Sequence, residues 1–476
     1  MKRLHEIAAP RKLPPGAPKP SDVCFSSRWK HPRDDKDPHD TFRTAEAFHA
    51  TRLVWVYTLD AEFAAEVKRR GYGLQAAINS LVPDFPAQTR ERGRILDLDG
   101  HRIAAPWMRG WKGYWGCVNS PDWRASYLAT AKKCLDIGAD CLQMDDPPCN
   151  LAAVAWGGCL CDHCVAAFRE YLGKKATREE LAKLGIEKLE AFDFRAFLKE
   201  RNAPVGDAFA RWNDPLKKHF AEFQRQSVAA FYAWVRPELD KHAGRRVPMS
   251  SNNYDARWSF PYDLFDFGMA ELPARNATAA ALHHKFQDAH ARGKAQVFTF
   301  VSDDKALTRK VIATSYACGG HLIVPWDVYM GSNAARYYGK PEDYADLYKL
   351  VRDNAALFDG CEDAAIALPG VKDERYGKLP PIEVVGSRDV CAVVRAVPGQ
   401  AAAPVVVHLV DWGKTPSPFR LALQTHRFFA DGKLAATLLR PGQEPMPLRT
   451  AVKASQTLLD LPALGPWGIV VVAPAK

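Results

Sequence analysis

One short segment, residues 138–148, constrains the fold more than any other part of the chain. It begins as an apolar run and ends in two acids followed by two prolines. Side chains alternate along a strand, so Gln143 and Asp145 share one face while Leu142 and Met144 share the other. Proline lacks the amide hydrogen of a sheet ladder, so the prolines end the strand. An acid at this point is typical of a catalytic position in a (β/α)8 barrel, although a polar turn gives the same pattern.

Strand and helix patterns alternate around this segment over residues 51–358, which predicts an α/β fold of the (β/α)8 type. A long, mostly helical insertion follows the fourth strand at residues 148–245. Short alternating strands at residues 359–476 predict a small C-terminal antiparallel β-sandwich, and residues 1–50 are expected to form an irregular N-terminal arm. The expected barrel strands cover residues 53–57, 73–78, part of 80–120, 138–144, 246–250, 265–270, 295–300 and 321–326.

Charge and hydropathy restrict the partners of the chain. The net charge is +10, but the basic residues are scattered, which argues against a nucleic-acid surface. No apolar run is long enough to cross a membrane, and no apolar signal segment follows the first three residues. These features predict a cytoplasmic, reduced protein in which clustered cysteines bind metal rather than form disulfides. Homo-oligomer formation is left open.

Three cysteines within six residues indicate a metal site in the insertion. Cys159, Cys161 and Cys164 stand ahead of a helical pattern. Tetrahedral Zn²⁺ in structural sites takes four nitrogen or sulfur ligands, and close spacing favours their assembly. The fourth ligand is then Cys117, or Cys149 or His163 as alternatives, and buried free thiols are the competing interpretation. The expected cofactor is a structural zinc ion without any organic cofactor.

The same region resembles the family 42 β-galactosidases. The resemblance rests on Cys117-x-Asn119-Ser120-Pro121, on Gln143-x-Asp145 and on the three later cysteines. It implies a barrel over roughly residues 50–360 and a structural zinc held by Cys117, Cys159, Cys161 and Cys164. The family's acid/base glutamate corresponds to Pro147 here, which cannot transfer a proton. The resemblance therefore implies the fold and the zinc, whereas β-galactosidase activity does not carry over.

Two carboxyl groups at the barrel mouth are the expected catalytic pair. Glycoside hydrolysis normally uses one carboxyl group as acid and a second as nucleophile or base. Asp145 follows the fourth strand, and Glu271 follows an apolar run whose burial would raise its pKa. This layout resembles retaining barrels of the α-galactosidase clan, with Asp145 as nucleophile and Glu271 as acid/base. A helix-start acid or an ion pair with Arg275 remains the alternative for Glu271.

Other assignments of the acids stay open. Asp145 and Asp146 together resemble the pair of substrate-assisted hexosaminidases, in which Asp145 would orient an acetamido group and Asp146 would be the acid. Asp146 also suits a turn, and Asp303 and Asp304 suit a helix cap at least as well as catalysis. Because Pro147 replaces the expected glutamate, a catalytically silent carbohydrate-binding barrel is a further alternative. A zinc hydrolase is disfavoured, since a closed cysteine site leaves no open coordination position.

Aromatic and polar residues predict a carbohydrate substrate. Aromatic rings offer an apolar face for sugars, and amide, guanidinium and carboxylate groups bind hydroxyls. Core packing or turn formation explains each of these residues equally well. The expected function is that of a glycosidase that cleaves an oligosaccharide or glycoside. The expected substrate-binding residues are Trp111, Tyr114, Trp115, Asn252, Arg275, Trp326 and Asp327.

Overall fold

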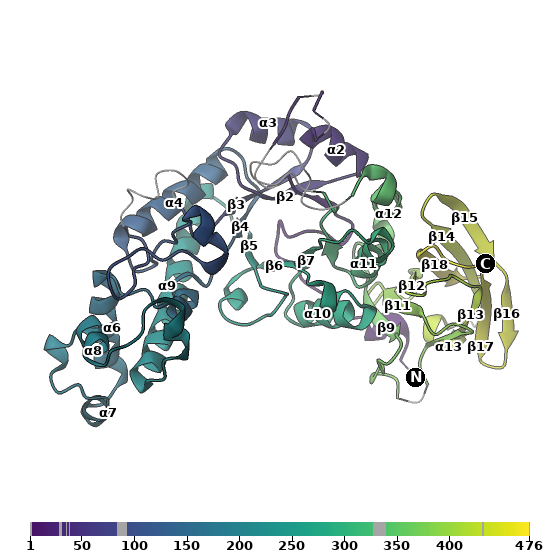
Figure 1. Ribbon diagram of the computed structural model, residues 1–476. Coiled ribbons are helices and arrows are strands. Elements are labelled where there is room, and N and C mark those ends of the chain that lie inside the picture. Colours follow the sequence, from purple (N-terminus) through teal and green to yellow (C-terminus); the bar gives the residue numbers. More distant parts are fainter. Residues whose placement is uncertain are drawn as a thin grey trace.

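The computed structural model describes residues 2–27, 31–34, 36–37, 39–82, 93–326, 339–377, 379–430 and 433–475. These residues form an arch with an α/β barrel at its centre (Figure 1). A helical insertion extends from one side of the barrel, and a β-sheet domain lies on the other side.

Eight parallel strands pair in chain order from β1 to β8. The Val324 amide, just after β8, donates to the Cys24 carbonyl of β1 at 2.9 Å, which brings the last strand against the first. The expected (β/α)8 barrel with C-terminal antiparallel sheets is therefore confirmed. Its strands are β1 (Cys24–Phe25), β2 (Arg52–Val56), β3 (Gly73–Ile78), β4 (Cys141–Met144), β5 (Met249–Asn252), β6 (Phe267–Glu271), β7 (Gln296–Thr299) and β8 (His321–Leu322).

Two strand positions differ from the sequence-based expectation. The first strand, β1, lies within residues 1–50, where only an irregular arm was expected, because two residues are too few to show an alternating pattern. The strand expected in residues 80–120 is absent from the described part of that stretch, which forms isolated bridges such as Arg94 with Gly116 and Ala104 with Tyr114. The two errors offset each other, so Asp145 still follows the fourth strand.

Helices cover the outside of the barrel. The segment between β5 and β6 carries only the short 3-10 helix η6 (Tyr262–Leu264) in place of an α-helix. No described helix is long and apolar enough to cross a membrane. The covering helices are α2 (Thr41–Ala47), α3 (Ala61–Arg69), α4 (Pro121–Asp136), α9 (Pro215–Ala243), α10 (Ala279–Ala291), α11 (Lys305–Ala317) and α12 (Pro341–Asp353).

The side chains of β4 lie on the two faces that the strand alternation predicts. Leu142 and Met144 belong to the core between sheet and helices, and the Tyr127 hydroxyl of α4 donates to Met144 Sδ at 2.9 Å. Cys141 lies instead in the barrel interior with Phe267 and Met269 of β6. The inner face of β4 therefore leads to Asp145, and the inner face of β6 leads to Glu271.

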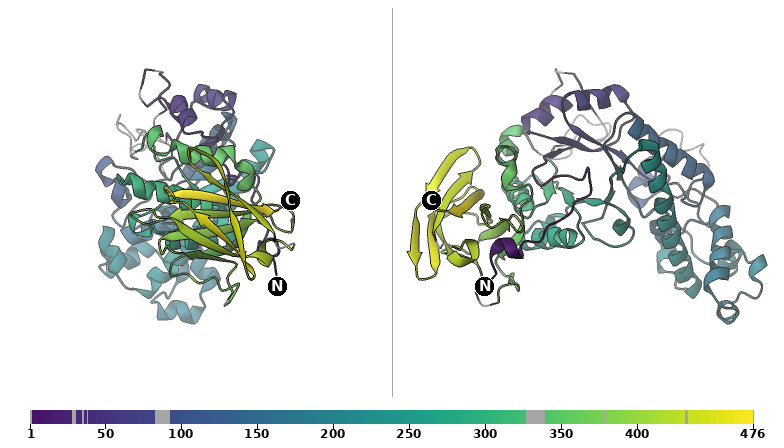
Figure 2. Two further views of the ribbon diagram at one scale, coloured as in Figure 1. Left: turned by 90° about the vertical axis from the view of Figure 1, so that its right-hand side faces the viewer. Right: turned by 180° about the vertical axis from the view of Figure 1, so that it is seen from behind.

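The insertion has its own aromatic core. Rings of Phe168, Phe194, Phe220 and Phe223 pack together, with Phe168 and Phe220 at 5.1 Å between centroids. Helix α9, 29 residues long, contributes its first half to this core and its second half to the barrel core. The rear view shows this long helix joining the two parts (Figure 2). The other helices of the insertion are α5 (Cys149–Ala153), η3 (Val154–Trp156), α6 (Asp162–Lys175), α7 (Arg178–Lys183), η4 (Leu189–Ala191), α8 (Phe194–Glu200) and η5 (Gly206–Arg211).

The C-terminal domain is built from two antiparallel sheets around one apolar core. The four-stranded sheet has the order β10-β13-β17-β16, and the six-stranded sheet has the order β15-β14-β18-β12-β11-β9. The N-terminal helix α1 (Leu4–Ile7) packs Leu4 into this core. The remaining elements are β9 (Glu362–Ala367), β10 (Ile382–Val385), β11 (Val390–Ala396), β12 (Val405–Asp411), β13 (Phe419–Gln424), α13 (Thr425–Phe428), β14 (Leu434–Arg440), β15 (Gln443–Leu448), β16 (Thr450–Lys453), β17 (Gln456–Leu461) and β18 (Trp467–Pro474).

Gly116 marks a close approach between the segment after β3 and α4. A Cβ atom at this position would lie 1.8 Å from Trp123 Nε1, whereas one at Gly110 would meet nothing within 4 Å. We expect Gly116→Ala to lower the free energy of unfolding by about 1–3 kcal/mol, because the buried Trp123 ring must shift. Gly110→Ala is the control and should change it little. Equal denaturation curves for the two variants would contradict this packing.

Candidate active site

Asp145 lies at the carboxyl end of β4, half-buried and held by two side-chain donors. The Tyr57 hydroxyl donates to its Oδ2, and Asn252 Nδ2 donates to its Oδ1 at 3.0 Å. The donors come from the ends of β2 and β5, so three strands meet at this carboxylate. The Asp145 amide continues the ladder by donating to the Ile78 carbonyl of β3 at 2.8 Å. The carboxylate is therefore fixed in position by barrel strands rather than by loops.

A polar network in the barrel interior lies beneath Asp145. The Ser250 hydroxyl donates to Gln143 Oε1 and accepts from Gln75 Nε2 at 2.8 Å. Gln75 Oε1 in turn accepts from the Trp55 amide at 3.1 Å. Trp55 has a positive φ of 54° at a register shift in β2, which indicates a bulge. The bulge sits two residues before Tyr57, the residue that donates to Asp145.

Asp146 turns away from the strand and is buried. Its φ of 52° lies in the left-handed region, which aspartate tolerates better than most residues. The Tyr254 hydroxyl donates to its Oδ1 at 3.3 Å, and its backbone carbonyl accepts from Ser80 Oγ at 2.9 Å. Burial raises the pKa of the Asp146 carboxyl well above its usual range, and the neighbouring charges of Asp145 and Glu271 raise it further. The hydrogen bond from Tyr254 acts in the opposite direction and lowers the pKa.

Glu271 ends β6 on the inner face, two residues after Met269. Its side chain is exposed, so the burial expected from its apolar flanking run is wrong. Its charge is one of the causes of the raised pKa of Asp146, so the carboxylates after β4 and β6 interact electrostatically. The two acids predicted as a catalytic pair therefore lie at the same end of the barrel.

The residues predicted to bind substrate fall into two groups. The first group follows barrel strands: Asn252 contacts Asp145, Arg275 is exposed in the 3-10 helix η7 (Ala274–Asn276), and Trp326 is buried with its ring 5.2 Å from His39. Asp327 lies outside the described residues.

The second group, Trp111, Tyr114 and Trp115, belongs to the segment between β3 and α4 and packs with the insertion. Trp115 is fully buried and lies 5.1 Å from the Trp156 ring, so it supports neighbouring rings and presents no face to solvent. Asp304 caps α11 by accepting from the Leu307 amide at 2.9 Å, which confirms its interpretation as a cap.

Sequence reasoning missed the tyrosines that hold the acids. Tyr57 ends an expected strand, and Tyr254 follows the Asn252-Asn253 pair by one residue, so both stand where barrel strands end. The polar residue after a strand was the available signal in each case. Tyr254 has a φ of 32°, which no sequence pattern reveals.

The four cysteines predicted as ligands lie together in the insertion. Cys117, Cys159, Cys161 and Cys164 are buried, and their sulfur atoms lie within 4.8 Å of one another. The alternatives are set apart, since Cys149 contacts Ser80 Oγ at 3.0 Å and His163 is exposed. The Cys117 sulfur is 3.7 Å from that of Cys161 and 3.4 Å from that of Cys164.

These sulfur distances fit a bound metal ion better than a disulfide. Tetrahedral sulfurs at a bond length of about 2.3 Å are about 3.8 Å apart, whereas disulfide sulfurs are about 2 Å apart. Asn150 Nδ2 donates to Cys117 Sγ at 3.2 Å and to Cys164 Sγ at 3.4 Å, the kind of contact that supports thiolate ligands. The cluster can therefore hold a metal ion.

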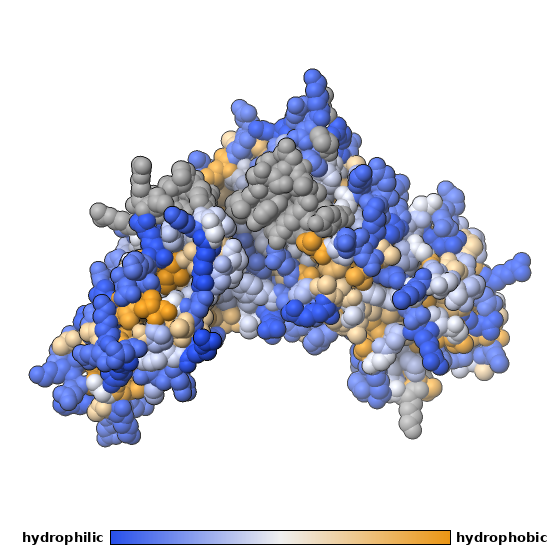
Figure 3. Space-filling view, in the orientation of Figure 1, coloured by the Kyte–Doolittle hydropathy of each residue, from blue (hydrophilic) through white to orange (hydrophobic). Residues whose placement is uncertain are grey.

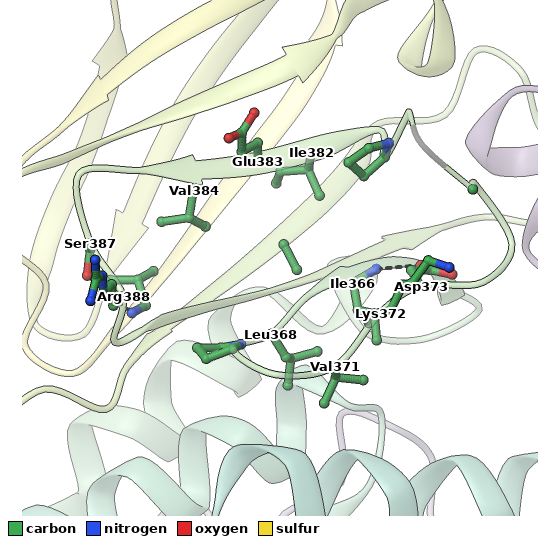
Figure 4. Close-up of a pocket in the computed structure, with 15 residues that line it drawn as sticks. Ile366, Leu368, Val371, Lys372, Asp373, Ile382, Glu383, Val384, Ser387 and Arg388 are labelled. Atoms are coloured by element: carbon green, nitrogen blue, oxygen red, sulfur yellow. Dashed lines mark hydrogen bonds between the residues drawn. The ribbon is translucent and has the colours of Figure 1, made fainter.

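A cavity of 490 Å³ lies in the C-terminal domain, between β10 and the segment that follows β9 (Figure 4). Its walls include Leu368, Val371 and Ile382, and its described lining contains no aromatic ring. It belongs to a different domain from Asp145 and Glu271. A smaller cavity of 180 Å³ is lined by Tyr57, Thr58 and Asn79 at the ends of β2 and β3, and by Thr130 and Cys134 of α4.

The chain is similar in sequence to two α-agarases. No known protein-family profile matches it. The α-agarase of Thalassotalea agarivorans is 25% identical over 370 residues, which cover 70% of this chain and 24% of the agarase. The α-agarase of Alteromonas agarilytica is 22% identical over 363 residues, covering 67% of this chain and 25% of the agarase. The aligned region thus spans about a quarter of each relative.

Solved structures of carbohydrate-active enzymes share the fold. A cycloisomaltooligosaccharide glucanotransferase of Paenibacillus sp., with cycloisomaltoheptaose bound, superposes with a TM-score of 0.55 and 9% identity, covering 95% of this chain and 85% of that one. A maltogenic α-amylase of Thermotoga neapolitana gives a TM-score of 0.52 and 8% identity, covering 96% and 99%. At these identities the likeness is one of fold.

The raised pKa of Asp146 predicts a pH dependence of stability. An unfolded Asp releases its proton near pH 4, whereas folded Asp146 keeps it to higher pH, so this group's contribution to stability falls as pH rises above about 4. Each tenfold difference in proton affinity corresponds to about 1.4 kcal/mol. We expect Asp146→Asn to gain melting temperature relative to wild type between pH 4 and pH 8. The exposed Asp303→Asn is the control, and a difference independent of pH would contradict the buried, protonated state.

Proposed function

We propose that the chain is a glycoside hydrolase that cleaves O-glycosidic bonds in an oligosaccharide. The observation that carries the proposal is the placement of Asp145 at the end of β4, with donors from Tyr57 and Asn252, and of Glu271 at the end of β6. Two carboxyl groups at one barrel mouth are the requirement for this reaction. The similarity to α-agarases supports the same reaction class.

Asp145 acts as the nucleophile of a retaining mechanism. Hydrogen bonds from Tyr57 and Asn252 favour its ionised form and fix the direction in which its oxygens point. The attacking oxygen forms a covalent bond to the sugar while the bond to the leaving oxygen breaks. Asp145 loses its negative charge as it bonds to the sugar, and the hydrogen bond from the Tyr57 hydroxyl then becomes weaker. This hydrogen bond therefore affects how readily Asp145 attacks.

Glu271 acts as the acid/base in both steps. It protonates the leaving oxygen in the first step and removes a proton from the incoming water in the second. Its exposure gives it access to that water. Burial raises the pKa of Asp146, which disfavours a second negative charge beside the Asp145 carboxylate.

Agar oligosaccharides are the substrates to examine first. The two relatives are named for action on agar, and the aligned region covers more than two thirds of the present chain in each comparison. The same region covers only about a quarter of each agarase, so the substrate is proposed for the barrel by similarity alone.

The raised pKa of Asp146 favours a second candidate, a substrate-assisted hexosaminidase. In that reaction Asp146 supplies the proton and Asp145 orients the acetamido group of the sugar. The direction of the pKa shift of Asp146, upward, suits a group that donates a proton. N-acetylated substrates distinguish the candidates, because only the second requires the acetamido group.

The metal of the cysteine cluster is proposed to be structural zinc. Four thiolates without an open coordination position are typical of structural zinc sites. The family 42 resemblance and the division of the chain into residues 1–50, 51–358 and 359–476 remain predictions. When bound, zinc would supply crosslinking between Cys117 and the Cys159–Cys164 loop, with no part in bond cleavage.

Hydrolysis assays test the catalytic pair. We expect wild type to release sugars from agar oligosaccharides or from a panel of aryl α- and β-glycosides. Asp145→Asn and Glu271→Gln should each reduce kcat at least about a hundredfold, because each removes a group required in the transition state. Asp353→Asn is the matched control, since Asp353 is exposed at the end of α12, away from the strand ends that carry the acids. Full activity in Asp145→Asn, or turnover restricted to N-acetylated sugars, would reject this mechanism.

Metal analysis tests the zinc proposal. We expect about one zinc per chain by mass spectrometry of the native protein, lost in Cys164→Ser, with a lower melting temperature because four buried thiols lose their common partner. Cys149→Ser should retain the metal, since that thiol contacts Ser80 instead. Metal-free wild type with unchanged melting temperature would contradict a structural metal.

A further inference from the structure

The segment that follows β5 holds three consecutive residues with left-handed backbone. Tyr254, Asp255 and Ala256 have φ of 32°, 61° and 58°. Residues with a side chain enter this region one at a time, and glycine is the usual choice because it has no Cβ atom. A run of three costs conformational free energy, so it persists only where neighbouring contacts enforce it. The contacts of the three side chains therefore explain the turn.

One end of this turn contacts the acids that follow β4. The Tyr254 hydroxyl donates to Asp146 Oδ1 at 3.3 Å. The Tyr254 amide donates to Oδ1 of Asn252, whose own amide group donates to Asp145. Ala256, at the other end of the turn, is buried in the core between the sheet and the helices. The turn thus joins the barrel core to the two residues that hold Asp145 and Asp146.

Asp255, in the middle of the turn, contacts the segment that follows β6. Asn276 Nδ2 donates to both of its carboxylate oxygens, at 2.7 Å to Oδ1 and at 2.8 Å to Oδ2. Asn276 ends η7, the 3-10 helix between Glu271 and α10. The Asp255 carboxylate therefore joins the turn that carries Tyr254 to the segment that begins at Glu271.

Lys285 of α10 holds Asp255 from a third element. Its Nζ lies 2.9 Å from Asp255 Oδ1 and donates to the Asp255 backbone carbonyl at 2.5 Å. Hydrophilic side chains cover much of the molecular face in Figure 3, yet the side chains of Lys285 and Asp255 are only 14% and 17% exposed. A pair with so little exposure is weakly screened by salt, and loss of one partner leaves the other charge uncompensated. Asp255 is therefore fixed on the side of α10 independently of Asn276.

The strain of this turn lies beside the candidate catalytic acids, and strained backbone commonly serves function at such places. Glycine would adopt the same backbone without strain. It would supply neither the hydroxyl that reaches Asp146 nor the carboxylate that binds Asn276. Tyr254, whose bulk suits a positive φ least, makes the contact with the acid. The strain thus accompanies a contact to the candidate site rather than one needed only for packing.

We propose that Asp255 is a positioning residue of the candidate active site. Through the turn it places the Tyr254 hydroxyl on Asp146, and through Asn276 it fixes the segment that follows Glu271. It thereby couples the acids after β4 to the acid after β6, and it acts through these two residues rather than on the substrate. The inference rests on the proposed function in taking Glu271 as the acid/base.

Hydrogen exchange followed by peptide mass spectrometry tests the coupling without a substrate. Asn276→Ala removes the amide but leaves the pair of Asp255 and Lys285, so the full chain should stay folded. We expect amide exchange to become at least about tenfold faster both around Tyr254 and after Glu271, because both segments lose a contact that opposes local opening. Exchange unchanged in either segment would overturn the proposal.

A control variant and a double variant locate the effect. Asn354→Ala also removes one half-buried amide group, which donates to the Leu350 carbonyl at 2.9 Å, and it should leave exchange in both segments unchanged. Tyr254→Phe should speed exchange around residue 254 in wild type but add little in Asn276→Ala, because both changes release the same turn. Equal effects of Tyr254→Phe in the two backgrounds would overturn the proposal.

Leaving-group dependence separates positioning of the acid from loss of folded protein. The value of kcat/KM reports bond cleavage, which needs the acid for a phenyl glycoside and needs it little for the matched dinitrophenyl glycoside. We expect Asn276→Ala to lower kcat/KM at least about tenfold for the first and less than about threefold for the second. Equal losses on both substrates would reveal a structural role and overturn the proposal. A wild type inactive on every substrate would overturn the proposed function, and hydrogen exchange would still decide whether Asp255 couples the two segments.

Discussion

Parallel pairing of the barrel strands in chain order is the constraint on which the candidate site depends. It brings the carboxyl ends of β2, β4, β5 and β6 to one end of the barrel, although their residues are up to about two hundred positions apart. Tyr57, Asp145, Asn252 and Glu271 each occupy such an end. The network of Gln75, Gln143 and Ser250 below them joins β3, β4 and β5 through side-chain hydrogen bonds. The positions of these four side chains therefore follow from the pairing of the barrel strands, and the loops make a smaller contribution.

Asp145 and Asp146 carry the same carboxyl group but lie in different surroundings. Asp145 stays on the strand and receives two side-chain donors, which favour the ionised form. Asp146 turns into a buried position beside two other acids, which favours the protonated form. The two adjacent aspartates thus lie in different electrostatic environments at the same end of the barrel. The backbone of Asp146 is left-handed, so this residue no longer continues the strand that carries Asp145.

Sequence patterns predicted the elements with strong periodicity and missed those without it. The alternation in residues 138–144 identified the inner face of β4 and the position of Asp145, and the cysteine spacing identified a cluster that does assemble. The two-residue strand β1 has no periodicity to detect, and the segment after β3 forms single bridges rather than a strand. Exposure is also invisible to sequence, since Glu271 follows an apolar run yet faces solvent, whereas Trp115 is fully buried.

Proton NMR of the first product formed from an active substrate tests the central claim most directly. A nucleophilic Asp145 with Glu271 as acid/base passes through a covalent intermediate, so the initial sugar should have the same anomeric configuration as the bond cleaved. Peptide mass spectrometry of a trapped intermediate should place the sugar on Asp145. An initial product of inverted configuration, or a sugar attached to another carboxylate, would contradict the account.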